Sequence, residues 1–260
     1  VTQPIIYKAA TSRDTIFENV MIDYDGNLYF EDDTLTSNGR GIMMREDLSP
    51  YVSNNINLPP IDDMDGLIVA FITRRHTVVP LAARLTPEQA AATFMLGESI
   101  ETSAGDPKRA GESIREVGTN PFIIGDKSYE GNWFYDFVKR HEGKVQCYQL
   151  NTGGLGEIIE NQPNGVKVLK RKVQRIEIPE MSAIIRGIVR GTSKWNKDKY
   201  WNLEVPTFVE GMDLSKYQVE NFYDVDDITN QVSDLRSERV EYIEKFPALE
   251  KVIIKTAEMI

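Results

Sequence analysis

The feature that most constrains the fold is a continuous apolar run that is followed, after a short polar crossing, by a well-capped helix. The run covers residues 66–72 (GLIVAFI), and such a run is typical of a strand covered on both faces of a sheet. Thr86 is then placed to cap a helix, Pro87 suits its first position, and Gln89 completes a capping box. This stretch therefore predicts one strand and one helix of a layered α/β structure.

The rest of the chain alternates between strand and helix patterns. We predict a hairpin at 15–31, a helix at 128–140, a strand at 145–150 and a helix at 179–190. We interpret residues 53–65, which are rich in Asn, Pro and Asp, as a surface excursion rather than a domain boundary. The predicted fold class is α/β with α+β character, in which helices flank a mixed central sheet.

A different composition begins near residue 192. Four aromatic residues cluster among charges, and we favour a small core over a docking surface for Trp195, Tyr200, Trp201 and Phe208. A helical pattern from about residue 228 predicts an appendage packed on the sheet, with an oligomer contact as the alternative. We therefore expect one domain at 1–191 and an appended segment at 192–260.

Charge and composition exclude several functions. The formal net charge is -10, and no basic patch rich in aromatic residues offsets it, so we expect no nucleic-acid partner. The apolar runs are too short to span a membrane, so we expect no membrane association and a cytoplasmic protein. Cys147 is the single cysteine, and we expect it to be a buried small hydrophobic residue. We expect no metal ligands in this chain, and interpret Asp32-Asp33 and Asp62-Asp63 as solvated pairs.

The junction after the strand at 145–150 is the first candidate site. It reads Asn151-Thr152-Gly153-Gly154-Leu155-Gly156. Ligands of open α/β sheets bind beyond the carboxyl ends of strands, where glycines let backbone N–H groups approach a phosphate or base. The alternative is a tight loop that needs a positive φ at Gly153 or Gly154.

A second candidate is the pair Arg175-Ile176, which precedes the helix at 179–190. The guanidinium group could stack on a base while the backbone reads the base edge, or Arg175 could be an exposed residue of an edge strand. His76 follows the first strand, and we expect a hydrogen-bonded surface or boundary residue rather than a catalytic one.

An ordered set of segments resembles the carboxyl-terminal half of ATP-type phosphoenolpyruvate carboxykinase. The set comprises IFENVMIDYDGNLYFEDDTLTSNGR at 16–40, the stretch at 71–111, VGTNPF at 117–122, NTGG at 151–154 and QRIEIPEMSAIIRGIVRG at 174–191. The order and spacing are similar across roughly residues 15 to 200, with one enlarged loop. The resemblance implies the carboxykinase fold and a nucleotide pocket.

The resemblance also implies roles for individual residues. Arg40 ends a Thr-x-Asn-x-Arg motif and matches an arginine that contacts the transferred phosphoryl group, although it could be a solvated loop residue. Arg175 and Ile176 match the pair beside the adenine, and Asn151, Thr152 and Gly153 match the start of a segment that shapes the same pocket. The family's lid position falls at 104–111, where Lys108 and Arg109 are candidate phosphate-side charges or ordinary solvated residues.

The sequence departs from the family's pattern near the chemistry. Gly154 stands in place of a tryptophan, 155–173 forms a longer insert, and Arg74-Arg75-His76 interrupts a segment that is normally small, acidic and aromatic. Gln174 and Met181 replace a lysine and a threonine, and Gln3 stands where the family has a glutamate. A Gly-x-x-x-x-Gly-Lys-Ser/Thr phosphate loop does not occur in this sequence.

Two functions follow as hypotheses. The first is the nucleotide-binding half of a carboxykinase-like phosphotransferase, inactive alone, which uses ATP or GTP with Mg²⁺ or Mn²⁺ only together with an upstream phosphate-loop portion of the same polypeptide. The second is a noncatalytic binding or scaffolding module that retains the fold.

Overall fold

The computed structural model of this chain describes residues 4–12, 14–32, 34, 39–49, 52, 57–101, 112–120, 122–161 and 167–260. The chain separates into two compact units, one from the described residues up to 60 together with Glu101 and one from those of 61–100 and 112–260. Because the units divide at Pro60 and Ile61, the interpretation of 53–65 as a surface excursion rather than a boundary is wrong. Pro59 and Pro60 lack a backbone N–H, so neither can extend a hydrogen-bonded strand across the division.

The first unit is small and contains the predicted hairpin. Its elements are α1 (Pro4–Ala10), β1 (Ile16–Glu18), β2 (Met21–Ile22), β3 (Leu28–Tyr29), β4 (Arg40–Ile42) and the 3₁₀ turn η1 (Arg45–Leu48). β2 and β3 pair antiparallel, which confirms the hairpin, and Gly26 in its turn has a φ of 84°. β1 pairs antiparallel with β4 and places Glu18 opposite Arg40.

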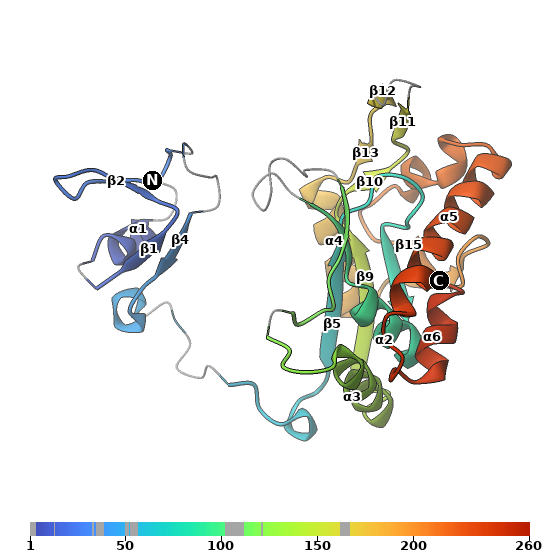
Figure 1. The fold of residues 1–260 in the computed structure, drawn as a ribbon, viewed down its shortest axis with the longest axis horizontal. Helices are drawn as coiled ribbons and strands as arrows, with labels where there is room; N and C mark the ends of the chain where they lie inside the picture. The colour runs from blue at the N-terminus through green and yellow to red at the C-terminus, as the bar shows by residue number, and fades with distance from the viewer. Residues whose placement is uncertain are drawn as a thin grey trace. The chain divides into compact units, whose positions relative to one another are not determined.

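The second unit contains the remaining elements (Figure 1). They are η2 (Ile61–Asp63), β5 (Leu67–Thr73), β6 (Ala82–Leu85), α2 (Pro87–Leu96), β7 (Glu98–Ile100), β8 (Ser113–Arg115), α3 (Lys127–Arg140), β9 (Val145–Asn151), β10 (Gly154–Leu155), β11 (Ile158–Asn161), β12 (Lys167–Arg171), β13 (Gln174–Arg175), α4 (Ile178–Arg190), β14 (Lys194–Lys197), β15 (Glu204–Phe208), η3 (Leu214–Tyr217), η4 (Val219–Asn221), α5 (Val225–Ile243) and α6 (Lys251–Ala257). The predicted strands and helices between residues 66 and 190 are therefore confirmed.

A five-stranded mixed sheet forms the centre of this unit. Its order is β14-β15-β6-β9-β5, in which β5 and β9 are parallel and the other neighbours antiparallel. The predicted mixed sheet flanked by helices is confirmed. The register of the parallel pair places Thr73 opposite Asn151, so both strands end at the same edge of the sheet.

The aromatic segment after residue 192 contributes two of these strands, which the sequence did not predict. Trp201 and Leu203 belong to the main hydrophobic core rather than to a separate small one. The indole N–H of Trp201 donates to the carbonyl oxygen of Val78 at 3.1 Å. This segment is thus continuous with the central sheet in both pairing and packing.

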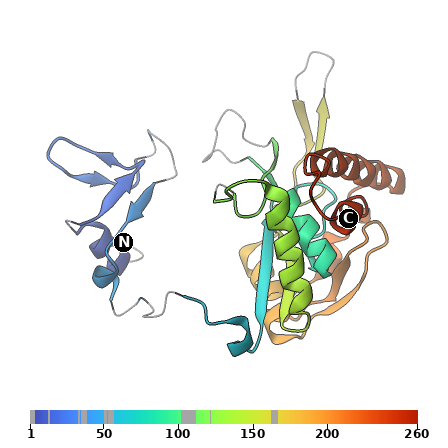
Figure 2. The ribbon, with the colours of Figure 1, turned by 60° about the horizontal axis from the view of Figure 1, so that its bottom comes forward.

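Alternation along the strands gives the sheet two covered faces (Figure 2). Cys147 on β9 and Leu85 on β6 point into the core that is shared with α2, α3, α5 and α6. Tyr148, the next residue on β9, and Ala82, three residues before Leu85 on β6, point into a second core with Ile184 of α4. The prediction that Cys147 is buried is confirmed, since its exposed fraction is 2%.

β5 lies at one end of the sheet and is only partly covered. Its apolar run predicted burial on both faces, but Ile68 and Ile72 are 42% and 60% exposed, so this prediction is wrong for the described residues. The reason is positional, because β5 is the end strand of the sheet, and these two residues lie outside the core that α4 forms with Ala82, Tyr148 and Leu150.

The helix ends follow the sequence closely. The N–H of Gln89 donates to Oγ1 of Thr86 at 3.3 Å, and the N–H of Thr86 donates to Oε1 of Gln89 at 3.0 Å, so the capping box is present. α4 ends at Gly191 in the left-handed conformation. In α3, Phe134 is buried as expected, whereas Trp133 is 62% exposed.

The insert at 155–173 and the carboxyl-terminal helices occupy separate places. β11 and β12 pair antiparallel and form a hairpin, drawn near the top of Figure 1. α5 and α6 pack against α2 and against each other, so the helical appendage lies on the helix layer rather than directly on the sheet.

Candidate functional site

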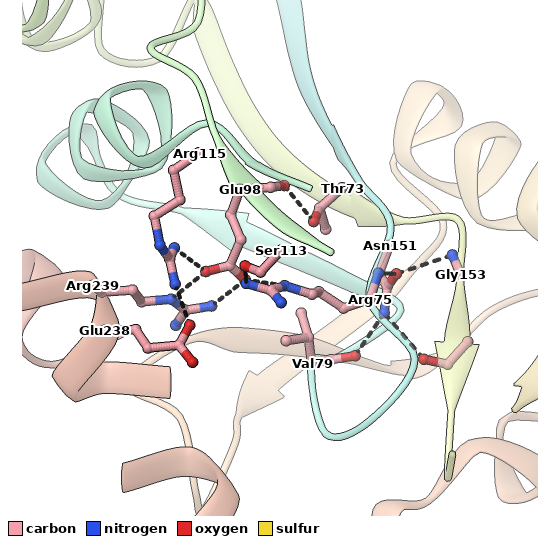
Figure 3. A network of polar contacts seen from close by, with 11 residues as sticks. Thr73, Arg75, Val79, Glu98, Ser113, Arg115, Asn151, Gly153, Glu238 and Arg239 are labelled. Carbon is pink, nitrogen blue, oxygen red and sulfur yellow. Dashed lines mark hydrogen bonds and ion pairs between the residues drawn. The ribbon is translucent and has the colours of Figure 1, made fainter. Parts of the chain in front are cut away.

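Asn151 lies at the carboxyl end of β9 and is completely buried. Its Oδ1 accepts hydrogen bonds from the N–H groups of Arg75 at 2.9 Å and Gly153 at 3.0 Å. Its Nδ2 donates to the carbonyl oxygens of Val79 at 3.0 Å and Gly154 at 3.3 Å (Figure 3). The amide is therefore used within the protein, and it ties the loop after β9 to the loop after β5.

Thr152 and Gly153 continue this attachment. The N–H and Oγ1 of Thr152 both donate to the carbonyl oxygen of Thr73, at 2.9 and 3.2 Å. A Cβ on Gly153 would lie 2.2 Å from the carbonyl oxygen of Arg75, so no side chain fits at this position. Gly154 has a φ of 138°, which confirms the tight-loop interpretation at that residue.

The structure brings Arg175 next to this loop. β10 and β13 pair antiparallel, with Gly154 opposite Arg175. The Arg175 side chain is exposed, whereas Ile176 is buried in the core beneath α4. Asn151, Thr152 and Gly153 thus lie in one backbone segment and Arg175 in the segment paired with it. Ile176, the fifth residue predicted to lie beside the base, holds the Arg175 segment in place through its buried side chain.

Tyr217 holds the Arg175 segment from the other side. Its hydroxyl group lies 3.1 Å from the carbonyl oxygen of Arg175 and also contacts the carboxylate of Glu180. Burial, followed by the hydrogen bond to Glu180, raises the pKa of the Tyr217 hydroxyl group. The hydroxyl group therefore stays protonated at neutral pH and can donate a hydrogen bond.

A buried charged group, here called the Glu98 cluster, adjoins the loop that follows β5. It comprises Glu98, Arg75, Arg115 and Arg239. The Glu98 carboxylate accepts from Nε of Arg75 at 3.1 Å, from Nη1 of Arg115 at 2.5 Å, and from Nε and Nη2 of Arg239 at 2.9 Å each (Figure 3). The side chains are between 5% and 11% exposed.

The electrostatics of the cluster favour the ionised carboxylate. Burial alone would raise the pKa of Glu98, but Arg239, Arg75 and Arg115 outweigh it and hold the pKa well below its usual value. Glu238, which is half exposed, accepts from Arg115 at 3.0 Å and adds a second carboxylate at the rim.

Sequence reasoning missed the Glu98 cluster. The one signal was Arg74-Arg75 directly after a buried strand, because a charged residue that enters a core needs a partner. Nothing in the spacing identified Glu98 or Arg239 as that partner, since these two residues are 141 positions apart.

The other predicted residues lie elsewhere. Arg40 is in the first unit, where its Nη1 lies 3.9 Å from Oε2 of Glu18 and its side chain is 66% exposed. Lys108 and Arg109 lie outside the described residues. Nδ1 of His76 lies 3.4 Å from Oε2 of Glu157, and the His76 side chain is 24% exposed, which places it at the boundary of the unit.

The described residues of the second unit line at least two cavities. One of about 280 Å³ is lined by residues that include Thr73, Glu98 and Arg239, and one of about 480 Å³ by residues that include Leu155 and Tyr217. The five predicted base-side residues line neither cavity. Within the described ranges, no group of three His, Cys, Asp or Glu side chains could hold a metal ion. No helix in the same ranges is long and apolar enough to cross a membrane.

These features define an α/β protein whose candidate site lies where two parallel strands end. The chain belongs to the ATP-type phosphoenolpyruvate carboxykinase family, because the family model described as phosphoenolpyruvate carboxykinase matches residues 1–215.

Individual relatives agree with this membership. The phosphoenolpyruvate carboxykinase (ATP) of Aeropyrum pernix is 31% identical over 237 residues, which cover 91% of this chain and 43% of that protein. The protein of the same name from Novosphingobium aromaticivorans is 27% identical over 218 residues, and that from Nitrobacter hamburgensis 26% over 215 residues, covering 38% and 37% of those proteins. The chain thus spans about two fifths of the length of these relatives.

Proposed function

We propose that this chain is the carboxyl-terminal, nucleotide-binding part of a phosphoenolpyruvate carboxykinase-like phosphotransferase. The observation that carries the proposal is the pairing of β10 with β13, which places Arg175 opposite Gly154 and directly beside the Asn151–Gly153 loop. In other α/β sheets this position, beyond the carboxyl ends of parallel strands, is where ligands bind. Family membership supports a nucleotide as that ligand, and the relatives' name includes ATP.

In this proposal different residues contact the base and the phosphates of a purine nucleotide. The exposed guanidinium group of Arg175 stacks on the base, and the backbone around Ile176 reads the base edge. Asn151, Thr152 and Gly153 shape the floor of the pocket through their bonds to the loop after β5. Arg40 is the candidate clamp for charge that develops on the transferred phosphoryl group.

The proposed reaction also requires a phosphate loop, and no Gly-x-x-x-x-Gly-Lys-Ser/Thr sequence occurs in residues 1–260. The proposed partner is an upstream, phosphate-loop portion of the same polypeptide, and this chain alone is expected to be inactive. A divalent Mg²⁺ or Mn²⁺ ion would neutralise phosphate charge during transfer. The described residues include no group of three His, Cys, Asp or Glu side chains that could hold such an ion. We propose residues 1–191 as the nucleotide-binding portion of the chain, with 192–260 supplying β14, β15 and the carboxyl-terminal helices that complete its second unit. We further propose a cytoplasmic location without nucleic-acid or membrane partners.

A noncatalytic binding or scaffolding module is the second candidate. One observation favours it: Arg75 stands within a segment that is small and acidic in the resembled family, and its side chain is committed to the buried Glu98 cluster. The ion pair between Arg75 and Glu98 stabilises the fold, but it leaves the Arg75 guanidinium group unavailable to a ligand in the loop after β5.

Nucleotide-dependent stabilisation of the full-length protein tests the proposal. A ligand that binds only the folded state at 100 times its Kd should raise the free energy of unfolding by about 2.7 kcal/mol. ATP and GTP, each with Mg²⁺ or Mn²⁺, are compared by thermal unfolding. We expect Arg175→Ala to reduce the shift, whereas Arg186→Ala, an exposed arginine on α4, should leave it unchanged. No shift at millimolar nucleotide, or equal shifts in wild type and Arg175→Ala, would reject nucleotide binding at this site and favour the module.

A further inference from the structure

Arg75 is bonded through its backbone to the proposed nucleotide loop. Its N–H donates to Oδ1 of Asn151 at 2.9 Å, and its carbonyl oxygen accepts from the N–H of Gly154 at 3.0 Å. Gly153 packs so closely that an added Cβ would lie 2.2 Å from the same carbonyl oxygen. These contacts use main-chain atoms, so they persist whatever side chain stands at position 75.

The side chain of Arg75 reaches a different part of the fold. Its Nε donates to Oε1 of Glu98 on β7 at 3.1 Å, and its Nη2 donates to Oγ of Ser113 on β8 at 2.9 Å. The guanidinium group is planar and its donors have a fixed geometry, so it holds both strands of the β7–β8 pair at once (Figure 3). Only 11% of the side chain is exposed, which leaves it little freedom to change partners.

We infer that Arg75 is a positioning residue that couples the 151–154 loop, and with it the Arg175 segment, to the β7–β8 pair. The inference rests on the proposed function, because that loop is the proposed floor of the nucleotide pocket. A nucleotide that favours one position of the loop also selects one position of the Arg75 backbone. The guanidinium group can keep its hydrogen bonds to Glu98 and Ser113 only if β7 and β8 adopt the position that fits this Arg75 backbone. Nucleotide binding at the 151–154 loop is therefore energetically coupled to the position of the β7–β8 pair.

The other arginines of the Glu98 cluster provide matched comparisons. Arg115 and Arg239 bind the same carboxylate from β8 and α5, and both are at least as buried as Arg75. In the part of the chain that the structure describes, neither is hydrogen-bonded to residues 151–154. A role limited to stabilising the cluster would make all three arginines equivalent, whereas coupling is specific to Arg75.

Hydrogen exchange of the full-length protein measures the coupling. With saturating ATP and Mg²⁺, we expect slower amide exchange in the wild-type peptides that contain residues 98–100 and 113–115. Arg75→Lys keeps a cation beside Glu98 but removes the planar guanidinium group that bonds to Glu98 and Ser113 at the same time. We expect it to reduce this nucleotide-dependent protection by about five-fold or more, the lower end of typical coupling strengths, and to weaken ATP binding by a similar factor. Arg115→Lys should retain both the protection and the affinity.

The possible outcomes separate the coupling from the nucleotide site. Stabilisation by ATP without a change in exchange at β7–β8, or equal losses in Arg75→Lys and Arg115→Lys, would overturn the coupling alone. Failure of ATP and of GTP to stabilise the wild-type protein would overturn both proposals. If Arg75→Lys does not fold, Ser113→Ala takes its place, since it removes one hydrogen bond of the Arg75 guanidinium group and changes no charged residue. We then expect a partial loss of the nucleotide-dependent protection from exchange, and unchanged protection would contradict the inference.

Discussion

Replacing Glu98 by glutamine should destabilise the second unit strongly, because it removes the carboxylate, 8% exposed, that pairs with the three buried guanidinium groups of the Glu98 cluster. In the Glu98→Gln variant the half-exposed Glu238 is the remaining carboxylate of the group. The new amide would also point N–H donors at guanidinium donors. Breaking a buried ion pair by removing one partner typically costs about 3–5 kcal/mol, a large part of a total stability of about 5–15 kcal/mol.

The pH dependence gives this prediction a second test. The pKa of Glu98 in the folded protein lies well below its ordinary value of 4.5, so its stabilising contribution is fully present above that ordinary pKa. The contribution is lost as the pH falls through the depressed folded-state pKa. Glutamine does not titrate, so the difference in unfolding free energy between wild type and Glu98→Gln should stay constant at neutral pH and narrow in acid.

Urea unfolding followed by tryptophan fluorescence measures both effects. Trp133, Trp195 and Trp201 are the three tryptophans and all lie in the second unit, so the signal follows the unit that contains Glu98. Curves at pH 7, 5.5, 4.5 and 4 would map the pH dependence.

Glu204→Gln is the matched control, because Glu204 pairs with Arg84 at an exposed position and surface pairs contribute about 0–1 kcal/mol. A cost for Glu98→Gln below about 1 kcal/mol at pH 7 would refute the argument that the three arginines depend on this carboxylate. A difference that does not narrow in acid would refute the assigned ionisation.

Two further predictions follow from burial and close packing. Gly153→Ala should lower the free energy of unfolding by about 1–3 kcal/mol, because its Cβ would lie 2.2 Å from the carbonyl oxygen of Arg75; an unchanged urea midpoint would contradict this. Cys147 is 2% exposed and burial raises the pKa of its thiol group to about 12, so iodoacetamide at pH 8 should leave it unmodified in the folded protein and alkylate it in urea. Mass spectrometry reads the result, and rapid labelling of folded protein would contradict it.

Local signals in the sequence predicted the elements that depend on neighbouring residues. The capping box at Thr86 and Gln89, the left-handed end of α4 at Gly191 and the burial of Cys147 each follow from chemistry within a few positions. The glycine requirement of the loop after β9 was also visible, because Gly153 and Gly154 follow a strand end directly.

Features that depend on distant pairing were not predictable from one sequence. β14 and β15 join the sheet through pairing with β6, more than 100 residues earlier in the chain. Glu98 meets Arg239 across 141 positions, and no local pattern distinguishes either residue from a solvated one. The apolar run of β5 indicated a strand correctly but could not show that the strand lies at the end of the sheet.

That end position has a practical consequence. β5 pairs with β9 along one edge and, within the described residues, with no strand along the other, and its sequence LIVAFIT contains no charged residue that would block a new neighbour. An open, apolar strand edge is a template on which a strand from another molecule can add. Oligomers or precipitates in preparations of this 260-residue chain should therefore be treated as products of edge-to-edge addition until a variant such as Ile68→Lys has been shown to leave them unchanged.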